Sequence, residues 1–402
     1  MSNLTDMKQY NRMFVIQAIH SRNAVSKSDI ADYCGITYVT AHSIVQELVQ
    51  KGACLENGSA HSGGRKKALY SINNSFCYIL GLELYMYHIY ISIHDFGLNL
   101  VYEEKKPCDP TDVNRTILLI IKCLEEAIDA SNVPRDFFLG IGIAFPGRID
   151  QTAGRIVNIP KLVGWNNVYI EKIISKKMGL PVFIENDINV RLLAQKWDIG
   201  AENATDMILM TITEGIGAGV ISGGRLLQGA HSYVTEIGHT TLQYDGRLCG
   251  CGSRGCIETF ISNQAIIEKT LSLIGSHSDA ELHIQDIIEA AKGPDGGRFY
   301  EVFLETSKFI GLTIEHLIKI YDPAVILIEN DWLGEFPEIF ELMTENLFEK
   351  CVWLNSSMID IRLINNKDYW KSAMASLVLE KIFNYNQNNF INTFFSAREN
   401  AG

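Results

Sequence analysis

The stretch EIGHTTLQYDGRLCGCGSRGCIE, at residues 236–258, combines one histidine with three cysteines. These four candidate metal ligands are His239, Cys249, Cys251 and Cys256. One imidazole and three thiolates form the soft ligand set that suits tetrahedral zinc. Because all four positions are filled by protein, no place is left for an activated water, and we expect a structural Zn2+ that orders the loop around Glu236 and Glu258. The alternative is that the cysteines are buried free thiols.

The composition is that of a protein with several cores. With 402 residues, 47% of them hydrophobic, the chain is long enough for two or three domains. No stretch has the length and apolar character of a membrane span, and the first residues lack the apolar core of a signal peptide, so we expect a cytoplasmic protein without membrane contact. The nine cysteines, an odd number, fit a reducing compartment and indicate no disulfide framework.

Charge is distributed unevenly along the chain. The net charge of −12 argues against a general nucleic-acid binder, yet residues 1–75 hold eight Lys and Arg against five Asp and Glu. The whole chain holds 35 Lys and Arg against 47 Asp and Glu, so the acidic excess lies beyond residue 75. A mildly basic N-terminal segment on an acidic body predicts a separate module that faces an anion.

Residues 1–75 have the pattern of a winged helix-turn-helix. An apolar run at residues 13–19 predicts one helix, Ser26 precedes a second that ends near Tyr33, and Thr37 precedes a third at residues 38–51 after a turn at Gly35. Alternation of apolar and polar residues around a glycine-rich tip then predicts a two-stranded wing. The alternative is a small helical bundle with a solvated basic loop.

The third helix and the wing tip carry the groups that we expect at DNA. On the helix we expect Val39, Ile44, Val45, Leu48 and Val49 to face inward. The candidate DNA contacts are Thr37, Tyr38, Thr40, Ala41, His42 and Ser43 from the helix, and Gly64, Arg65 and Lys66 from the tip, where Lys67 is a further candidate for a phosphate.

From about residue 76, strand-like runs alternate with helical stretches, which predicts an α/β body. Asn186 and Asp187 stand at the end of an apolar strand, where open α/β sheets bind ligands, and their side chains suit sugar hydroxyls. Gly147 and Arg148 follow another strand and are placed to edge a polar pocket. The alternatives are that Asn186 and Asp187 cap the next helix, and that the segment with Gly147 and Arg148 is an ordinary strand-turn-strand corner.

Together the N-terminal module, the ENDIN strand end, the run GIGAGVISGGRLLQG and the cysteine motif resemble the transcriptional-regulator branch of the ROK family of repressors and sugar kinases. The resemblance implies two lobes of the actin-like, ribonuclease-H-like type at residues 76–190, completed by a helix at 370–385, and at 191–369. It also implies a monosaccharide bound by Gly147, Arg148, Asn186, Asp187, Glu236, His239 and Glu258.

Two departures from the family's kinases argue against an enzyme. Where the kinases have a D-x-G-G-T turn that approaches nucleotide phosphates, this chain has Glu83-Leu84-Tyr85-Met86-Tyr87. Where they have a pair of glycines beside adenosine, it has Asn330 and Asp331. We therefore expect no catalytic residue, and a repressor that binds operator DNA as a homodimer or homotetramer. A kinase with a DNA-binding module, and a regulator that answers to a protein partner, remain open.

Overall fold

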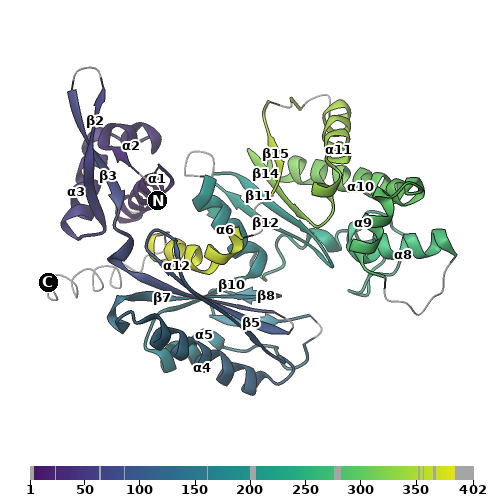
Figure 1. Cartoon of the computed structure of the whole chain (residues 1–402), viewed down its shortest axis with the longest axis horizontal. Helices are drawn as coiled ribbons and strands as arrows, with labels where there is room; N and C mark the ends of the chain where they lie inside the picture. The colour runs from purple at the N-terminus through teal and green to yellow at the C-terminus, as the bar shows by residue number, and fades with distance from the viewer. Residues whose placement is uncertain are drawn as a thin grey trace. The chain divides into compact units, whose positions relative to one another are not determined.

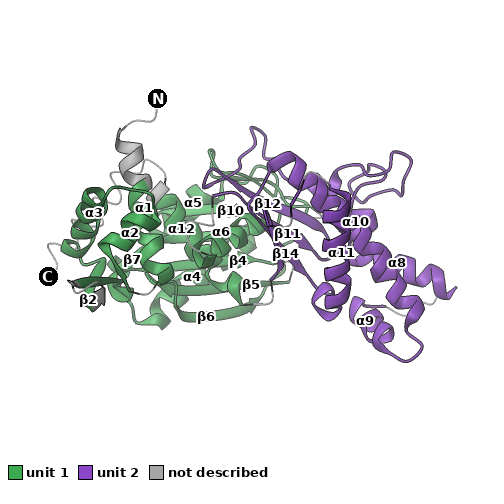
Figure 2. Ribbon diagram, turned by 90° about the horizontal axis from the view of Figure 1, so that it is seen from above, with its two compact units in different colours: residues 1–204, 368–402 green, residues 205–367 purple. Residues whose placement is uncertain are grey.

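The computed structural model describes residues 4–22, 24–62, 65–85, 87–160, 162–199, 205–275, 282–351, 354–355, 357–364 and 368–384. The chain forms two compact units, the first of residues 1–204 with 368–402 and the second of residues 205–367 (Figure 2). The N-terminal module belongs to the first unit, and so does the helix that follows Asp187. Among the described residues no helix is long and apolar enough to cross a membrane.

The N-terminal module consists of three helices and a β-hairpin. The helices are α1 (Leu4–Arg22), α2 (Lys27–Tyr33) and α3 (Tyr38–Gln50). Ser26 and Thr37 cap α2 and α3 by accepting hydrogen bonds from the backbone amides of Asp29 and Thr40. The hairpin strands β2 (Cys54–Ser62) and β3 (Arg65–Ile72) are antiparallel, and the short β1 (Val25–Ser26) extends the sheet beside β3. The predicted order of elements is therefore present.

The sheet of the first unit has the order β10-β7-β4-β5-β6. Its strands are β4 (Tyr78–Leu84), β5 (His88–Asp95), β6 (Leu100–Pro107), β7 (Phe138–Phe145) and β10 (Val182–Asn186). Helices α4 (Val113–Ser131) and α5 (Ile170–Met178) cover one face, and α6 (Asp187–Ile199) and α12 (Ala373–Asn384) cover the other (Figure 1). A small hairpin, β8 (Arg148–Asp150) with β9 (Arg155–Asn158), follows β7.

A glycine lets α12 lie directly on this sheet. A Cβ atom added at Gly142 of β7 would stand 2.1 Å from the backbone oxygen of Met374 in α12, closer than atoms can approach. The missing side chain therefore lets α12 lie on the strands that end at Phe145 and Asn186.

The second unit repeats the same sheet. Counted along the chain, the order β13-β12-β11-β14-β15 is third, second, first, fourth and fifth, which is also the order of the first sheet read from β6 to β10. Its strands are β11 (Met207–Ile212), β12 (Ile216–Ser222), β13 (Arg225–Leu226), β14 (Val325–Asn330) and β15 (Asp360–Leu363). Its helices are α7 (Glu258–Ile261), α8 (Asn263–Ile274), α9 (Ile284–Lys292), α10 (Gly297–Tyr321) and α11 (Pro337–Lys350). Two units with one strand order confirm the predicted two-lobed α/β body.

Candidate functional site

The four predicted metal ligands lie together in the second unit. One nitrogen of His239 and the sulfurs of Cys249, Cys251 and Cys256 are all within 4.8 Å of one another. The Nδ1 atom of His239 is 3.7 Å from the Sγ atom of Cys249, and Cys251 Sγ is 3.7 Å from Cys256 Sγ. Ligand atoms about 2.0–2.3 Å from one tetrahedral zinc ion lie about 3.5–3.8 Å apart, so the cluster has the size that zinc needs.

The loop is shaped by close backbone contacts. Gly255 has φ +66°, and a Cβ atom there would stand 1.6 Å from the backbone oxygen of Gln243. The amide of Leu242 donates to Gly255 O, and the amide of Gly255 donates to Arg247 O. Any side chain at Gly255 would push this segment away from Gln243 and so disturb the loop that carries Cys249 and Cys256.

The thiols differ in how readily they lose a proton. The backbone amide of Ser253 stabilises the thiolate of Cys251 and lowers its pKa to about 7, whereas burial raises the pKa of Cys249 to about 12. Metal binding must displace the remaining protons, so the affinity of the cluster for a metal falls as the pH is lowered.

The predicted sugar contacts of the second unit belong to the segments that carry this cluster. Glu258 is half-buried at the start of α7, with Oε1 3.6 Å from Cys249 Sγ. His239 ends the short helix η4 (Ile237–His239), and Glu236 precedes it; both are exposed. The glycine run also lies here, since a Cβ atom at Gly215 would meet Glu258 Oε2 at 3.5 Å. The candidate metal ligands and the carboxylates predicted to bind sugar hydroxyls thus share one loop system.

The other four predicted sugar contacts lie together in the first unit. The side-chain Nδ2 atom of Asn186 donates to Gly147 O at 2.9 Å, which joins the ends of β10 and β7. Its Oδ1 atom accepts from the amide of Ile188, so Asn186 also caps α6, of which Asp187 is the first residue. Arg148 donates through Nε to Asn158 Oδ1 at 2.6 Å. Polar groups therefore converge at the carboxyl ends of two parallel strands.

Glu83 has a partner that was not predicted from the sequence. This carboxylate is buried, and Arg191 of α6 donates to it at 3.1 Å. Burial raises the pKa of Glu83 to about 6, although Arg191 opposes the shift, and nearby Asp187 raises the pKa further. One feature of the sequence could have indicated this partner: Arg191 lies one helical turn after Asp187, on the same side of α6.

Two expectations for α3 are wrong. Ala41 is completely buried and cannot reach DNA, whereas Val39, expected inward, is 76% exposed. His42 and Ser43 are exposed as expected, and Tyr38 is 55% exposed. The hydroxyls of Thr37 and Thr40 are 2.8 Å apart and belong to the helix cap. Gly64 and the side chains of Arg65 and Lys66 lie outside the described residues.

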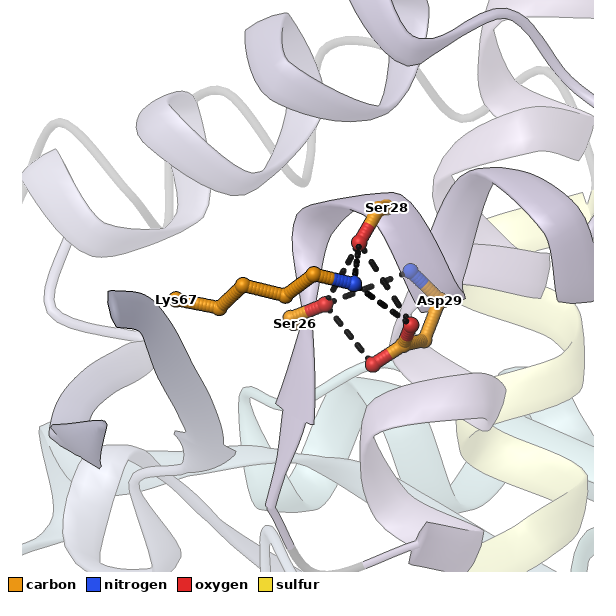
Figure 3. A network of polar contacts seen from close by, with 4 residues as sticks. All are labelled: Ser26, Ser28, Asp29 and Lys67. Carbon is orange, nitrogen blue, oxygen red and sulfur yellow. Dashed lines mark hydrogen bonds and ion pairs between the residues drawn. The ribbon is translucent and has the colours of Figure 1, made fainter. Parts of the chain in front are cut away.

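Lys67 of the hairpin points toward α2 rather than standing free (Figure 3). Its Nζ atom donates to Ser28 Oγ at 2.9 Å and lies 3.6 Å from Asp29 Oδ1. Ser26 donates to the other oxygen of Asp29 at 2.7 Å and thereby lowers the pKa of that carboxyl. The expectation that Lys67 grips a phosphate is therefore corrected, because its ammonium group ties the hairpin to the start of α2.

The model of the ROK family matches residues 79–368. The chain belongs to the ROK family. A relative from Caldicellulosiruptor bescii named xylose repressor is 29% identical over 352 residues, which cover 85% of this chain and 87% of the relative.

Solved structures share the fold. One is described as a ROK family transcriptional regulator, a homologue of the E. coli MLC protein, with a TM-score of 0.77 and 22% identity, covering 97% of this chain and 100% of its own. A ROK hexokinase from Thermus thermophilus has a TM-score of 0.65 and 24% identity, and covers 76% of this chain and 99% of its own. Because the match with the regulator covers 97% of this ROK protein, it includes most of the N-terminal module.

The cysteine cluster predicts about one zinc ion per chain in protein purified without added metal. Replacing Cys251 by serine removes one thiolate, and we expect elemental analysis to find most of the zinc lost. Cys34→Ser, outside the cluster, is the matched control and should retain the metal. A chain that holds no zinc, or equal zinc in both variants, would contradict the assignment.

Proposed function

We propose that this protein is a transcription regulator, a repressor, whose N-terminal module binds operator DNA and whose body binds a monosaccharide. The observation that carries the proposal is the three-helix module with its hairpin, joined in one chain to a ROK body. The similarity to a xylose repressor and to a structure described as a ROK transcriptional regulator supports the same function.

The packing around Tyr85 argues against phosphoryl transfer. The ring of Tyr85 stacks on His88 with centroids 4.3 Å apart and meets Trp370 edge-on at 6.3 Å. Burial raises the pKa of the Tyr85 hydroxyl. A D-x-G-G-T turn needs bare backbone amides at this place to approach phosphates, whereas here an aromatic cluster fills it.

The end of β14 offers little to a nucleotide. Asn330 Oδ1 accepts from the amides of Trp332 and Leu333, and Asp331 accepts from the side chain of Asn263 at 2.8 Å. An acidic side chain at this position repels a nucleotide, so we propose that the protein is not an enzyme. The alternative, a sugar kinase with a DNA-binding module, keeps Asp187 as a base and draws on the likeness to the ROK hexokinase fold.

Helix α6 connects the sugar residues with the DNA-binding module. It begins at Asp187, and near its other end the buried ring of Trp197 meets His20 of α1 edge-on at 5.8 Å. His20 Nε2 also hydrogen-bonds Gly97 O at 2.7 Å, and burial lowers the pKa of His20. A sugar that shifts α6 would thus shift α1, and in a dimer this changes how two modules meet a two-fold operator.

Metal and sugar binding are coupled in this proposal. When bound, zinc would hold His239 and the three thiolates in one tetrahedron. The chain's own contribution is to place Glu258 against Cys249, so that a fixed loop presents the carboxylate to sugar hydroxyls.

We predict that the protein binds a monosaccharide without phosphorylating it. A charged acceptor on a buried hydroxyl contributes about 1.5–3 kcal/mol, so Asp187→Ala should weaken sugar binding about tenfold to a hundredfold in calorimetry. Asp136→Ala, which removes an exposed carboxylate of the same unit, is the control and should bind normally. Xylose is the first sugar to test, followed by glucose, allose and N-acetylated sugars.

A coupled assay for ATP consumption, run on the same samples, separates the two functions. The account expects no turnover with any sugar that binds. Sustained consumption of ATP would show that the protein is a sugar kinase. Unchanged sugar affinity in Asp187→Ala would contradict the proposed sugar-binding pocket.

The contact between Lys67 and Asp29 predicts a particular DNA-binding defect. Lys67→Met should release the hairpin and lower affinity for the operator, while the slope of log K against log salt stays as in the unaltered protein, because no phosphate contact is lost. Lys122→Met removes an exposed charge from the body and should change neither quantity. A slope reduced by about 0.9 in Lys67→Met would show that this lysine contacts a phosphate after all.

A further inference from the structure

The two faces of α3 are sharply divided. Ala41, Ile44, Val45 and Leu48 are at most 3% exposed and pack into the module. Residues two apart on a helix point about 200° away from each other, so the burial of Ala41 turns Val39 to the opposite side. The outward stripe therefore reads Val39, His42, Ser43 and Gln46, spaced by three or four residues as one face of a helix requires.

Val39 is the apolar member of this stripe. Its side chain is 76% exposed in the first turn of α3, so it adds nothing to the core, and a β-branched residue there slightly lowers helix propensity. The neighbouring polar groups are already engaged: Thr37 and Thr40 bind each other in the cap, and Lys27 Nζ lies 3.4 Å from His42 Nδ1. An exposed isopropyl group is thus presented among hydrogen-bonding side chains.

The proposed DNA binding gives this valine a role. In helix-turn-helix modules the residues at the start of the last helix contact base edges in the major groove. The apolar group that base edges present there is the 5-methyl of thymine, since the other groups are hydrogen-bond donors and acceptors. A valine side chain has no donor or acceptor, so among these groups it complements the methyl.

We propose that Val39 contacts the 5-methyl group of one thymine in each operator half-site and so determines the base preference at that position. This inference rests on the proposed DNA binding and adds a specificity-determining residue to it. Burial of one methyl group corresponds to about a fourfold change in affinity, and two half-sites together to about tenfold or more.

Deoxyuridine provides the test, because it differs from thymidine by the absence of this methyl group alone. Operator duplexes are first selected from a random pool by the unaltered full-length protein, and each thymine is then replaced in turn by deoxyuridine. We expect one thymine of each half-site to show about a fourfold loss of affinity.

Two variants identify the residue responsible. Val39→Ala should bind the thymine and deoxyuridine duplexes equally at that position, with an unchanged salt slope. Val39→Thr retains one methyl group and should retain part of the difference. Since Val39 is exposed, both variants should fold normally, and their circular dichroism and zinc content should equal those of the unaltered protein.

Each outcome decides the proposal. If no thymine is sensitive, or if Val39→Ala keeps the full difference between thymine and deoxyuridine, Val39 does not read the methyl group. If the unaltered protein selects no sequence from the pool, the DNA-binding function itself fails, and this inference fails with it.

Discussion

A buried ion pair joins helices α6 and α12 in the first unit. Lys196 of α6 and Glu380 of α12 lie 2.8 Å apart, and their side chains are only 1% and 5% exposed. Breaking such a pair by removing one partner leaves an uncompensated buried charge and typically costs about 3–5 kcal/mol. The pair joins α12 to α6, and Gly142 lets the same helix lie on the sheet. Because α1 also packs on α6 and α12, the N-terminal module and the helix of Asp187 share one support.

In the second unit, the feature that fixes the predicted site is the loop that carries the cysteine cluster. Its cysteine loop is shaped by backbone contacts at Gly255 and brings four ligand atoms to distances that suit one metal ion. The carboxylate of Glu258 contacts this loop at the sulfur of Cys249, whereas Asp187 is the first residue of α6. The proposed sugar contacts are thus carried by two independently supported elements.

Local features of the sequence were enough for much of this account. The spacing of His239 and the cysteines predicted a ligand cluster, and the polar end of an apolar strand predicted the place of Asn186. Long-range pairings could not be predicted. Arg191 meets Glu83 across 108 residues and Lys67 meets Ser28 across 39, so each contact exists only once the chain has folded. The prediction for Val39 failed for another reason: the side chain is apolar, but its position on α3, two residues before the buried Ala41, turns it outward.

The central claim is that sugar binding in the body changes DNA binding by the N-terminal module. The most direct measurement is the fluorescence anisotropy of a labelled operator duplex titrated with the protein, with and without each monosaccharide that calorimetry shows to bind. The account predicts that at least one such sugar changes the dissociation constant for DNA about fivefold or more. The same dissociation constant with every sugar that binds would contradict it.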